Sequence, residues 1–191
     1  GGDAFVAARR LAEGGREVEL FELRSGARST HSEAASKAWT GPRRPLEALE
    51  ARAGDVVLDG LFGAGLSRPL EGTAAEAARR VGEAGAAVVA IDVPSGVRGD
   101  TGRADGPTFQ AADTVTFGAA KPAHVLLPAA GLCGRVHIMP IGIEAQIARM
   151  GVQLFENAPA LWADKLVWPE AGGHKYSRGR LIVVCGPAAS T

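Results

Sequence analysis

Apolar residues recur along this chain with two different periods, and their alternation predicts a layered α/β fold. Short apolar runs rich in β-branched residues, which are typical of buried strands in a parallel sheet, end at Asp59 and at Asp92. Between them, Thr73 opens a segment of capping-box form, and the alanine-rich helical pattern that follows ends near Gly85. The order strand, helix, strand implies right-handed crossovers and helices layered on a sheet.

The same pattern extends toward both ends of the chain. Apolar residues between Phe5 and Ala12 fall on one face of a helix that ends at the glycine pair 14–15. Further elements are expected as a strand over 17–23, a short helix over 45–52, and strands over 88–91, 114–117 and 135–138. From 144 to 168 the pattern weakens, as is typical of a connecting segment, and a last apolar strand is expected over 181–184.

The amino end predicts a further strand. The chain opens with Gly1-Gly2-Asp3 and passes at once into its first helix. In α/β folds a glycine turn before a helix normally follows a strand. We therefore expect the amino-terminal part of the fold to lie outside this chain.

The two strand-ending aspartates indicate a binding site. Ligands of parallel sheets bind outside the carboxyl ends of the strands, so Asp59 and Asp92 are expected to line one crevice. The glycines between 60 and 65 let backbone amides approach a phosphate, and Arg68 offers a forked, charge-assisted contact to the same group. The pattern predicts a site for a phosphorylated ligand with acid/base chemistry beside it. A carboxyl in such a crevice near another carboxylate is expected to have a raised pKa.

Each of these residues also has a purely structural interpretation. A strand-ending Asp usually accepts backbone amides of the following turn, and the Gly63-Ala64-Gly65 loop lacks the third glycine of a dinucleotide fingerprint. Lys121 alone is typical of a solvated surface charge. The four histidines show no metal-ligand spacing and are expected in surface or core packing: His31, His124, His137 and His174.

Composition excludes several classes of protein. The 191 residues are 46% hydrophobic, which suffices for one main core, and 21 basic residues balance 21 acidic ones. A net charge of zero leaves no electrostatic footprint for nucleic acid or an anionic membrane. Cys133 and Cys185 are far apart and match no metal spacing, so free thiols in a cytoplasmic protein are expected. No apolar run reaches about 18 residues, so no membrane span is expected.

Four segments together are more specific than any single glycine pattern. They are residues 1–9, 59–70, 92–96 and 116–122. In this order they resemble the NAD(P)HX epimerase family over residues 1–148. Residues 174–191 resemble the opening of an ADP-dependent NAD(P)H-hydrate dehydratase, a ribokinase-like domain, with 149–173 as a linker. The chain therefore resembles a fragment of a bifunctional repair enzyme, truncated within its second domain.

The resemblance implies a fold and an activity. The fold is a three-layer Rossmann-like α/β sandwich with a mainly parallel sheet, followed by the first strand of a ribokinase-like domain. The activity is epimerisation of the R and S forms of hydrated NADH and NADPH (NADHX and NADPHX), with dehydration expected only in the full-length bifunctional protein. One K⁺ per site, a homodimer, and no nucleic acid or membrane partner are also implied.

The resemblance also assigns residues. The implied substrate-binding residues are Gly1, Gly2, Asp3, Gly63, Ala64, Gly65, Leu66, Ser67, Arg68, Pro69 and Asp92. Asp59 and Ser95 match potassium ligands, and oxygen donors suit such a hard cation. The family loop Asn-Asn-Gly-Gly-Asp survives only as residues 1–3, so a further potassium ligand, its second Asn, is missing. Asp92 and Lys121 are the implied catalytic residues, with Lys121 orienting either Asp92 or a ligand phosphate.

Two alternatives to an enzyme stay open. A non-catalytic binding module is one, since an epimerase-like domain also occurs in an mRNA-decapping scaffold; a domain that mainly contributes a dimer surface is the other. Asp92, Ser95 and the complete 63–69 loop favour the enzyme over the scaffold, as does the neutral charge. An unpaired sheet edge is the feature that keeps the dimerisation module in consideration.

Overall fold

The computed structural model describes residues 2–23, 30–166, 168, 170–174, 176–177, 179–180, 182–184 and 186. The chain divides into two compact units, residues 1–152 and 153–191. Each unit is described by itself. The predicted domain boundaries at 148 and 173 stay predictions.

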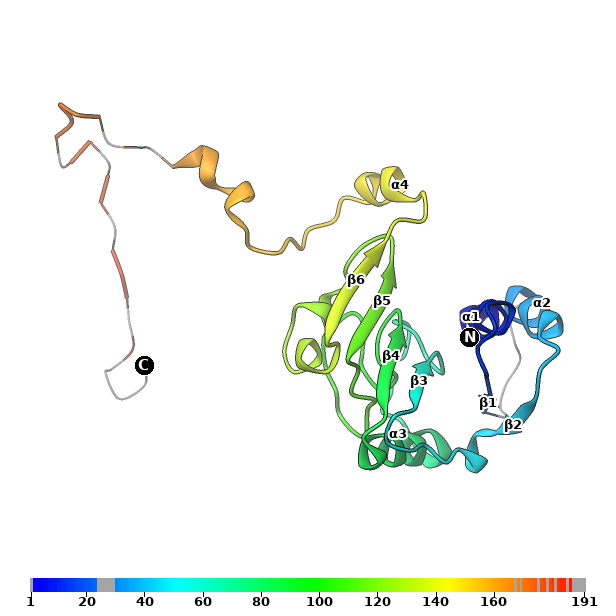
Figure 1. Cartoon of the computed structure of the whole chain (residues 1–191). Helices are drawn as coiled ribbons and strands as arrows, with labels where there is room; N and C mark the ends of the chain where they lie inside the picture. Colours follow the sequence, from blue (N-terminus) through cyan, green and yellow to red (C-terminus); the bar gives the residue numbers. More distant parts are fainter. Residues whose placement is uncertain are drawn as a thin grey trace. The chain divides into compact units, whose positions relative to one another are not determined.

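The first unit alternates helices and strands, as the apolar pattern predicts (Figure 1). Its helices are α1 (Gly2–Glu13), α2 (Thr30–Ala38), α3 (Gly72–Ala84) and α4 (Glu144–Arg149). Its strands are β1 (Leu20–Glu22), β2 (Arg43–Pro45), β3 (Val56–Asp59), β4 (Ala87–Ile91), β5 (Asp113–Phe117) and β6 (Arg135–Met139). Short 3₁₀ turns are η1 (Leu46–Ala48), η2 (Pro122–His124) and η3 (Ala129–Leu132). The short helix expected over 45–52 is wrong, because that segment ends β2 and forms only the single turn η1.

All described strand pairs are parallel, and they form two sheets. One sheet has the order β3-β4-β5-β6, and β1 pairs with β2 in the other. In the larger sheet Asp59 lies opposite Ala90, and Ile91 lies opposite Val115. The carboxyl ends of β3, β4 and β5 therefore meet at one edge. The predicted α/β class with parallel sheets is confirmed.

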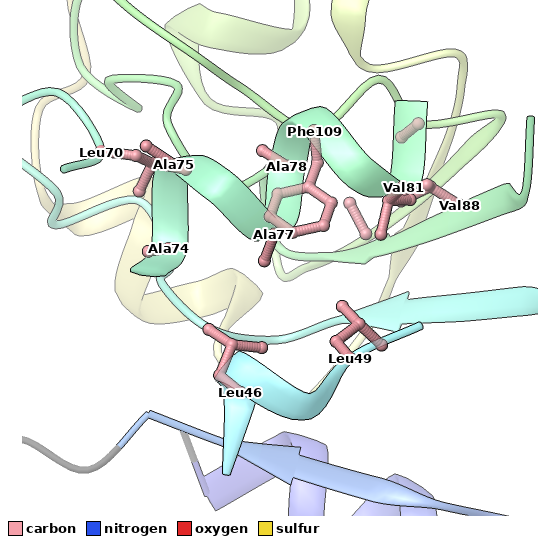
Figure 2. Close-up of a cluster of buried hydrophobic side chains, with 12 residues drawn as sticks. Leu46, Leu49, Leu70, Ala74, Ala75, Ala77, Ala78, Val81, Val88 and Phe109 are labelled. Carbon is pink, nitrogen blue, oxygen red and sulfur yellow. The ribbon is translucent and has the colours of Figure 1, made fainter. Parts of the chain in front are cut away.

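Helix α3 covers one face of the larger sheet (Figure 2). Its buried residues are small, which lets the helix approach the sheet closely: Ala74, Ala75, Ala77, Ala78 and Val81. They pack in one cluster with Val88 and Ala90 of β4, which also includes Leu46, Leu49, Leu70, Phe109 and Ala111. The helix ends at Gly85, as predicted, and Gly85 is in the left-handed conformation.

The predicted capping box at the start of α3 is wrong. The N-cap is Glu71, two residues before Thr73, and it makes no side-chain cap. The Thr73 hydroxyl donates instead to Glu47, and Glu76 pairs with Arg79 and Arg80. Other charged side chains, Glu47 before the helix and two arginines within it, therefore bind both side chains of the expected box.

A second buried cluster supports the loops beyond the sheet edge. Val93, Val97, Ala123 and Ala129 are each 0% exposed and pack together. They come from the loop after β4 and from the turns η2 and η3. This packing fixes the backbone on which the polar residues of the site are carried.

The second unit is built of short turns. It contains η4 (Pro159–Leu161) and η5 (Ala163–Lys165). Residues 181 and 185 lie outside the described residues, so the predicted ribokinase-like strand over 181–184 and the thiol of Cys185 stay predictions. Across the described part of the chain, no helix has the length and apolarity needed to cross a membrane.

Candidate functional site

Asp59 ends β3 and is 2% exposed. Its carboxylate accepts hydrogen bonds from the Ser95 amide and the Ser95 hydroxyl, both at 2.6 Å, and from the Leu61 amide at 3.3 Å. Burial raises the pKa of Asp59, and the bonds from Ser95 and Leu61 oppose that rise. Asp59 therefore ties the loop after β3 to the loop after β4.

The oxygens of Asp59 and Ser95 are of the kind that alkali cations prefer. Ser95 Oγ also accepts from the Phe62 amide at 3.0 Å, so the pair already has partners within the protein. In the part of the chain that the structure describes, no cluster of three or more His, Cys, Asp or Glu is placed for a metal. The donor set fits a hard monovalent cation in type rather than a zinc-like ion.

Asp92 follows β4 in an uncommon backbone conformation. Its φ of 71° is the only positive value at a non-glycine residue among those described. The Asp92 amide donates to the Val115 carbonyl at 2.7 Å, and the Asp92 carbonyl lies 2.8 Å from Nε2 of His124. The backbone of Asp92 is thus held on both sides, by β5 and by the turn η2.

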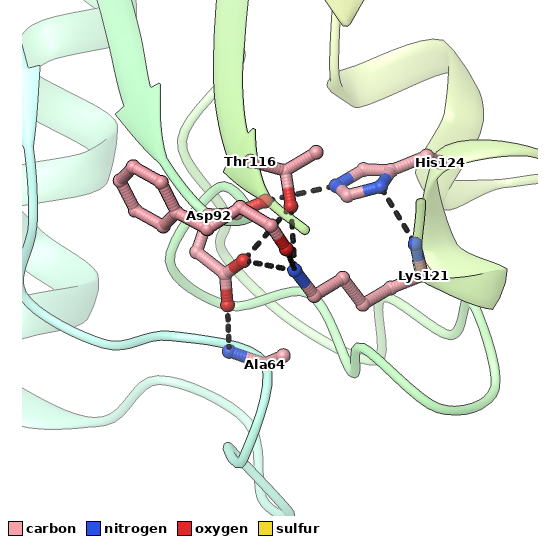
Figure 3. A network of polar contacts seen from close by, with 6 residues as sticks. Ala64, Asp92, Thr116, Lys121 and His124 are labelled. Atoms are coloured by element: carbon pink, nitrogen blue, oxygen red, sulfur yellow. Dashed lines mark hydrogen bonds and ion pairs between the residues drawn. The ribbon is translucent and has the colours of Figure 1, made fainter. Parts of the chain in front are cut away.

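The carboxylate of Asp92 is the centre of a polar network (Figure 3). Oδ1 lies 2.7 Å from Nζ of Lys121 and accepts from the Thr116 hydroxyl at 2.9 Å. Lys121 Nζ also donates to Thr116 Oγ1 at 2.7 Å and to the Phe117 carbonyl at 3.0 Å. The Ala64 amide donates to Oδ2 at 3.3 Å. Lys121 is therefore in direct contact with Asp92 in this structure.

The expected raised pKa of Asp92 is wrong. Burial does act to raise the pKa, but the hydrogen bonds from Lys121 and Thr116 and the Lys121 charge outweigh it, so the pKa lies below its ordinary value. The neighbour that decides the shift is an ammonium group rather than the second carboxylate. Asp92 is therefore ionised at neutral pH and is a proton acceptor in its resting state.

A cavity of about 310 Å³ opens beside this network. Its wall includes Asp3, Gly63, Asp92 and Lys121, together with the aromatic residues Phe62 and Phe117. Asp59 is not part of the wall, so the expected crevice with both carboxylates is wrong for Asp59, which lies buried behind it. The cavity joins α1 to the carboxyl ends of the strands, as the fold class requires.

The predicted substrate-binding loop is only partly at the cavity. Gly63 lines it, and Ala64 contacts Asp92. Residues beyond them are placed elsewhere: Gly65, Ser67, Arg68 and Pro69 are exposed outside the wall, and Leu66 packs against the α3 cluster. Gly2 is half-buried in α1, and Gly1 lies outside the described residues.

Sequence reasoning missed two residues of this network. Thr116 is 0% exposed and its hydroxyl joins Lys121 to Asp92; His124 is 8% exposed with both ring nitrogens bonded. A local signal for His124 exists, because it is the third residue of a Pro-initiated turn and its side chain reaches back to the turn's first amide. In the sequence, Thr116 is marked only as the first residue of the 116–122 segment, which gives it no role in the site.

Comparisons with known proteins identify the family of the chain. The sequence model of the family described as YjeF-related protein N-terminus matches residues 1–123. The chain is 36% identical over 157 residues to the NAD(P)H-hydrate epimerase of Rhodopirellula baltica, covering 78% of this chain and 64% of that protein. With the NAD(P)H-hydrate epimerase of Clavibacter sepedonicus the identity is 40% over 160 residues, covering 75% and 69%.

Longer relatives and a solved structure also match. The bifunctional NAD(P)H-hydrate repair enzyme Nnr of Thermofilum pendens is 38% identical over 200 residues, which cover 97% of this chain but only 37% of that enzyme. The crystal structure of yeast ynu0 has a TM-score of 0.60 and 18% identity, over 81% of this chain and 68% of the other, and shows the shared fold. By its sequence and its fold, the chain belongs to the family of YjeF-related protein N-termini.

Proposed function

We propose that this chain catalyses NAD(P)H-hydrate epimerisation, the interconversion of the R and S hydrates of NADH and NADPH. The observation that carries the proposal is the 2.7 Å contact between Asp92 and Lys121 in the wall of the cavity. The relatives named NAD(P)H-hydrate epimerase indicate the substrate class. A cavity of about 310 Å³ suits one ring of a dinucleotide, with the remainder of the molecule outside it.

The reaction needs one proton to be given and one to be taken back. The hydrated ring loses its hydroxyl as water, driven by the lone pair of the ring nitrogen, and water then adds to the opposite face of the planar cation. Lys121 has an ammonium proton for the departing hydroxyl, and the Asp92 carboxylate takes a proton from the water that adds. Transfer across their 2.7 Å contact restores the pair, and the Asp92 charge stabilises the cation.

We also propose that K⁺ binds at Asp59 and Ser95, whose oxygens are suitable donors. Bound there, the ion would supply positive charge near the strand ends, where phosphates of the substrate are attracted. We further propose a homodimer, which the family resemblance implies. A cytoplasmic location is proposed because free thiols are typical of a reducing compartment, and no nucleic-acid partner is proposed because the net charge is zero.

Asp92→Asn tests the function. The variant keeps the size of the side chain but removes the proton acceptor, so epimerisation is expected to slow by about 10² to 10⁴ fold without unfolding. The rate is measured by chiral chromatography of the two hydrates. Asp113→Asn is the matched control, since Asp113 pairs with Arg135 and His137 on the surface at the other end of β5. An Asp92→Asn enzyme as fast as this control would remove Asp92 from the mechanism.

A further inference from the structure

His124 links the backbones of the two residues that carry the proposed chemistry. Its Nδ1 accepts the Lys121 amide at 2.9 Å, and its Nε2 lies 2.8 Å from the Asp92 carbonyl oxygen (Figure 3). An amide can only donate and a carbonyl can only accept. The ring must therefore be neutral, with its hydrogen on Nε2.

The bond to the Asp92 carbonyl acts on a strained residue. With φ at 71°, Asp92 occupies the left-handed region that side chains rarely adopt. Such a conformation persists only when surrounding groups hold it. The Val115 carbonyl holds the Asp92 amide, and His124 holds the Asp92 carbonyl. In this conformation the carboxylate meets Lys121, Thr116 and the Ala64 amide.

We propose that His124, as the neutral Nε2–H tautomer, is a positioning residue that holds Asp92 and Lys121 in their reactive arrangement and releases them when it is protonated. The inference rests on the proposed epimerase function and adds a residue to it. His124 does not line the cavity, so it acts through Asp92 and Lys121 rather than on the substrate.

Protonation breaks the link for a geometric reason. A hydrogen on Nδ1 would face the Lys121 amide, and two donors repel. Burial lowers the pKa of His124, the bond to the Asp92 carbonyl opposes this, and the charged groups that face the ring are the Lys121 ammonium and the Asp92 carboxylate. The nearby Cys133 thiol, whose pKa burial raises to about 11, stays neutral. The link is therefore intact at neutral pH and is lost in acid.

Two substitutions separate the two bonds of the ring. His124→Gln places an amide NH₂ where Nε2 lies, so it keeps the bond to Asp92 without a titrating group. His124→Asn keeps an acceptor near Nδ1 for the Lys121 amide but does not reach Asp92. We expect kcat of the Asn variant to fall by about 10 to 100 fold with KM nearly unchanged, as for other groups that orient a reactive residue. The Gln variant is expected to keep kcat within about fivefold.

The pH profile gives a readout that a merely structural role would not move. As the pH falls, the full chain loses kcat first through His124, whose pKa lies below that of an ordinary histidine, and at lower pH through Asp92; the Gln variant retains only the lower step. His137→Gln, on the surface of β6, is the matched control and keeps both steps. An Asn variant with unchanged kcat, or a Gln variant with both acid steps, would overturn the proposal.

A measurement on the unsubstituted protein tests the proposal even if the His124 variants do not fold. The ¹H–¹⁵N couplings of histidine-labelled chain identify the tautomer of each ring, and the Nε2–H form is expected for His124 at neutral pH. A ring protonated on Nδ1, or a cation, contradicts the inference. Because this readout needs no activity, its failure is distinct from the failure of the epimerase function, which Asp92→Asn tests.

Discussion

The charge of Asp92 depends on one ammonium group. The carboxylate is partly withdrawn from water, which by itself raises the pKa, and the contact with Lys121, supported by the hydrogen bond from Thr116, reverses this. The residue thus combines a strained backbone with a charge set by its neighbour. The same ion pair favours the folded state at neutral pH, and this contribution is lost as the pH falls through the lowered pKa.

Lys121→Met tests that dependence. Without the ammonium, burial dominates and the pKa of Asp92 rises, because the charged form loses its partner. The lower acid step in kcat is therefore expected to move to higher pH by about 1 unit. The maximum kcat of the variant is also expected to be lower. Lys121→Arg keeps a positive charge and is the control, with its step close to the original. A step in the Met variant at the unsubstituted position would show that another group sets the charge of Asp92.

Residue-level properties of the site were the hardest to predict. Asp92 was singled out by its place after an apolar strand and by the family resemblance, and Lys121 by the resemblance. The direction of the Asp92 pKa was not predicted correctly, because it depends on Lys121, which is 29 positions away in sequence but 2.7 Å away in space. His124 was assigned to packing for the same reason. A titration depends on neighbours that only the folded chain brings together.

At the scale of elements, the site is held by loops and α3 fixes the sheet beneath them. Helix α3 buries alanines against β3 and β4 and ends at Gly85, whose φ is 67°. The sequence has alanines on the buried side of this helix and a glycine at its end, and that glycine adopts the left-handed conformation. The stability of the crossover therefore depends on glycines and alanines at particular positions.

Two glycines of this crossover should respond oppositely to alanine. Gly82 lies exposed within α3, where an added methyl group meets nothing, so Gly82→Ala is expected to raise the free energy of unfolding by about 0.5 to 1 kcal/mol. Gly85→Ala must enter the left-handed region and is expected to lower it by about 1 kcal/mol. Urea unfolding measures both. Equal changes of the same sign would contradict this account of the helix end.

Elements were predicted best where one local rule sufficed. The strands β3 to β6 and the helix α3 were expected within a few residues, because their apolar runs are short, β-branched or alanine-rich. The capping box failed since Glu47 and two arginines compete for its side chains. The helix expected over 45–52 failed because its first residue, Pro45, pairs with Glu22 of β1 and only the turn η1 follows. In both errors a partner distant in sequence takes part, Glu47 for Thr73 and β1 for Pro45.

At the scale of the whole molecule, the proposed K⁺ site joins two loops and so couples binding to folding. A ligand that binds the folded state alone stabilises it by mass action. K⁺ is therefore expected to raise the unfolding temperature relative to choline at equal ionic strength, by about 2 to 4 °C for each kcal/mol of binding. Calorimetry in the two chlorides measures the difference.

The control for this experiment is the surface carboxylate of Asp113. Asp113→Asn should keep the K⁺ effect, and Asp59→Asn should abolish it. Identical melting temperatures of the unsubstituted protein in both salts would show that Asp59 and Ser95 serve only to join the loops.

The bond between Asp59 and Ser95 also has a consequence for the order in which the chain folds. The two residues are 36 positions apart, and β3, α3 and β4 lie between or beside them. A contact of this separation forms only after the intervening chain has closed, and closing it costs entropy that local helix formation does not. Helix α3 can therefore form early, whereas the loops at the strand ends acquire their native arrangement late. The loops that carry the proposed catalytic residues thus reach their active arrangement only after the β3–α3–β4 crossover has formed.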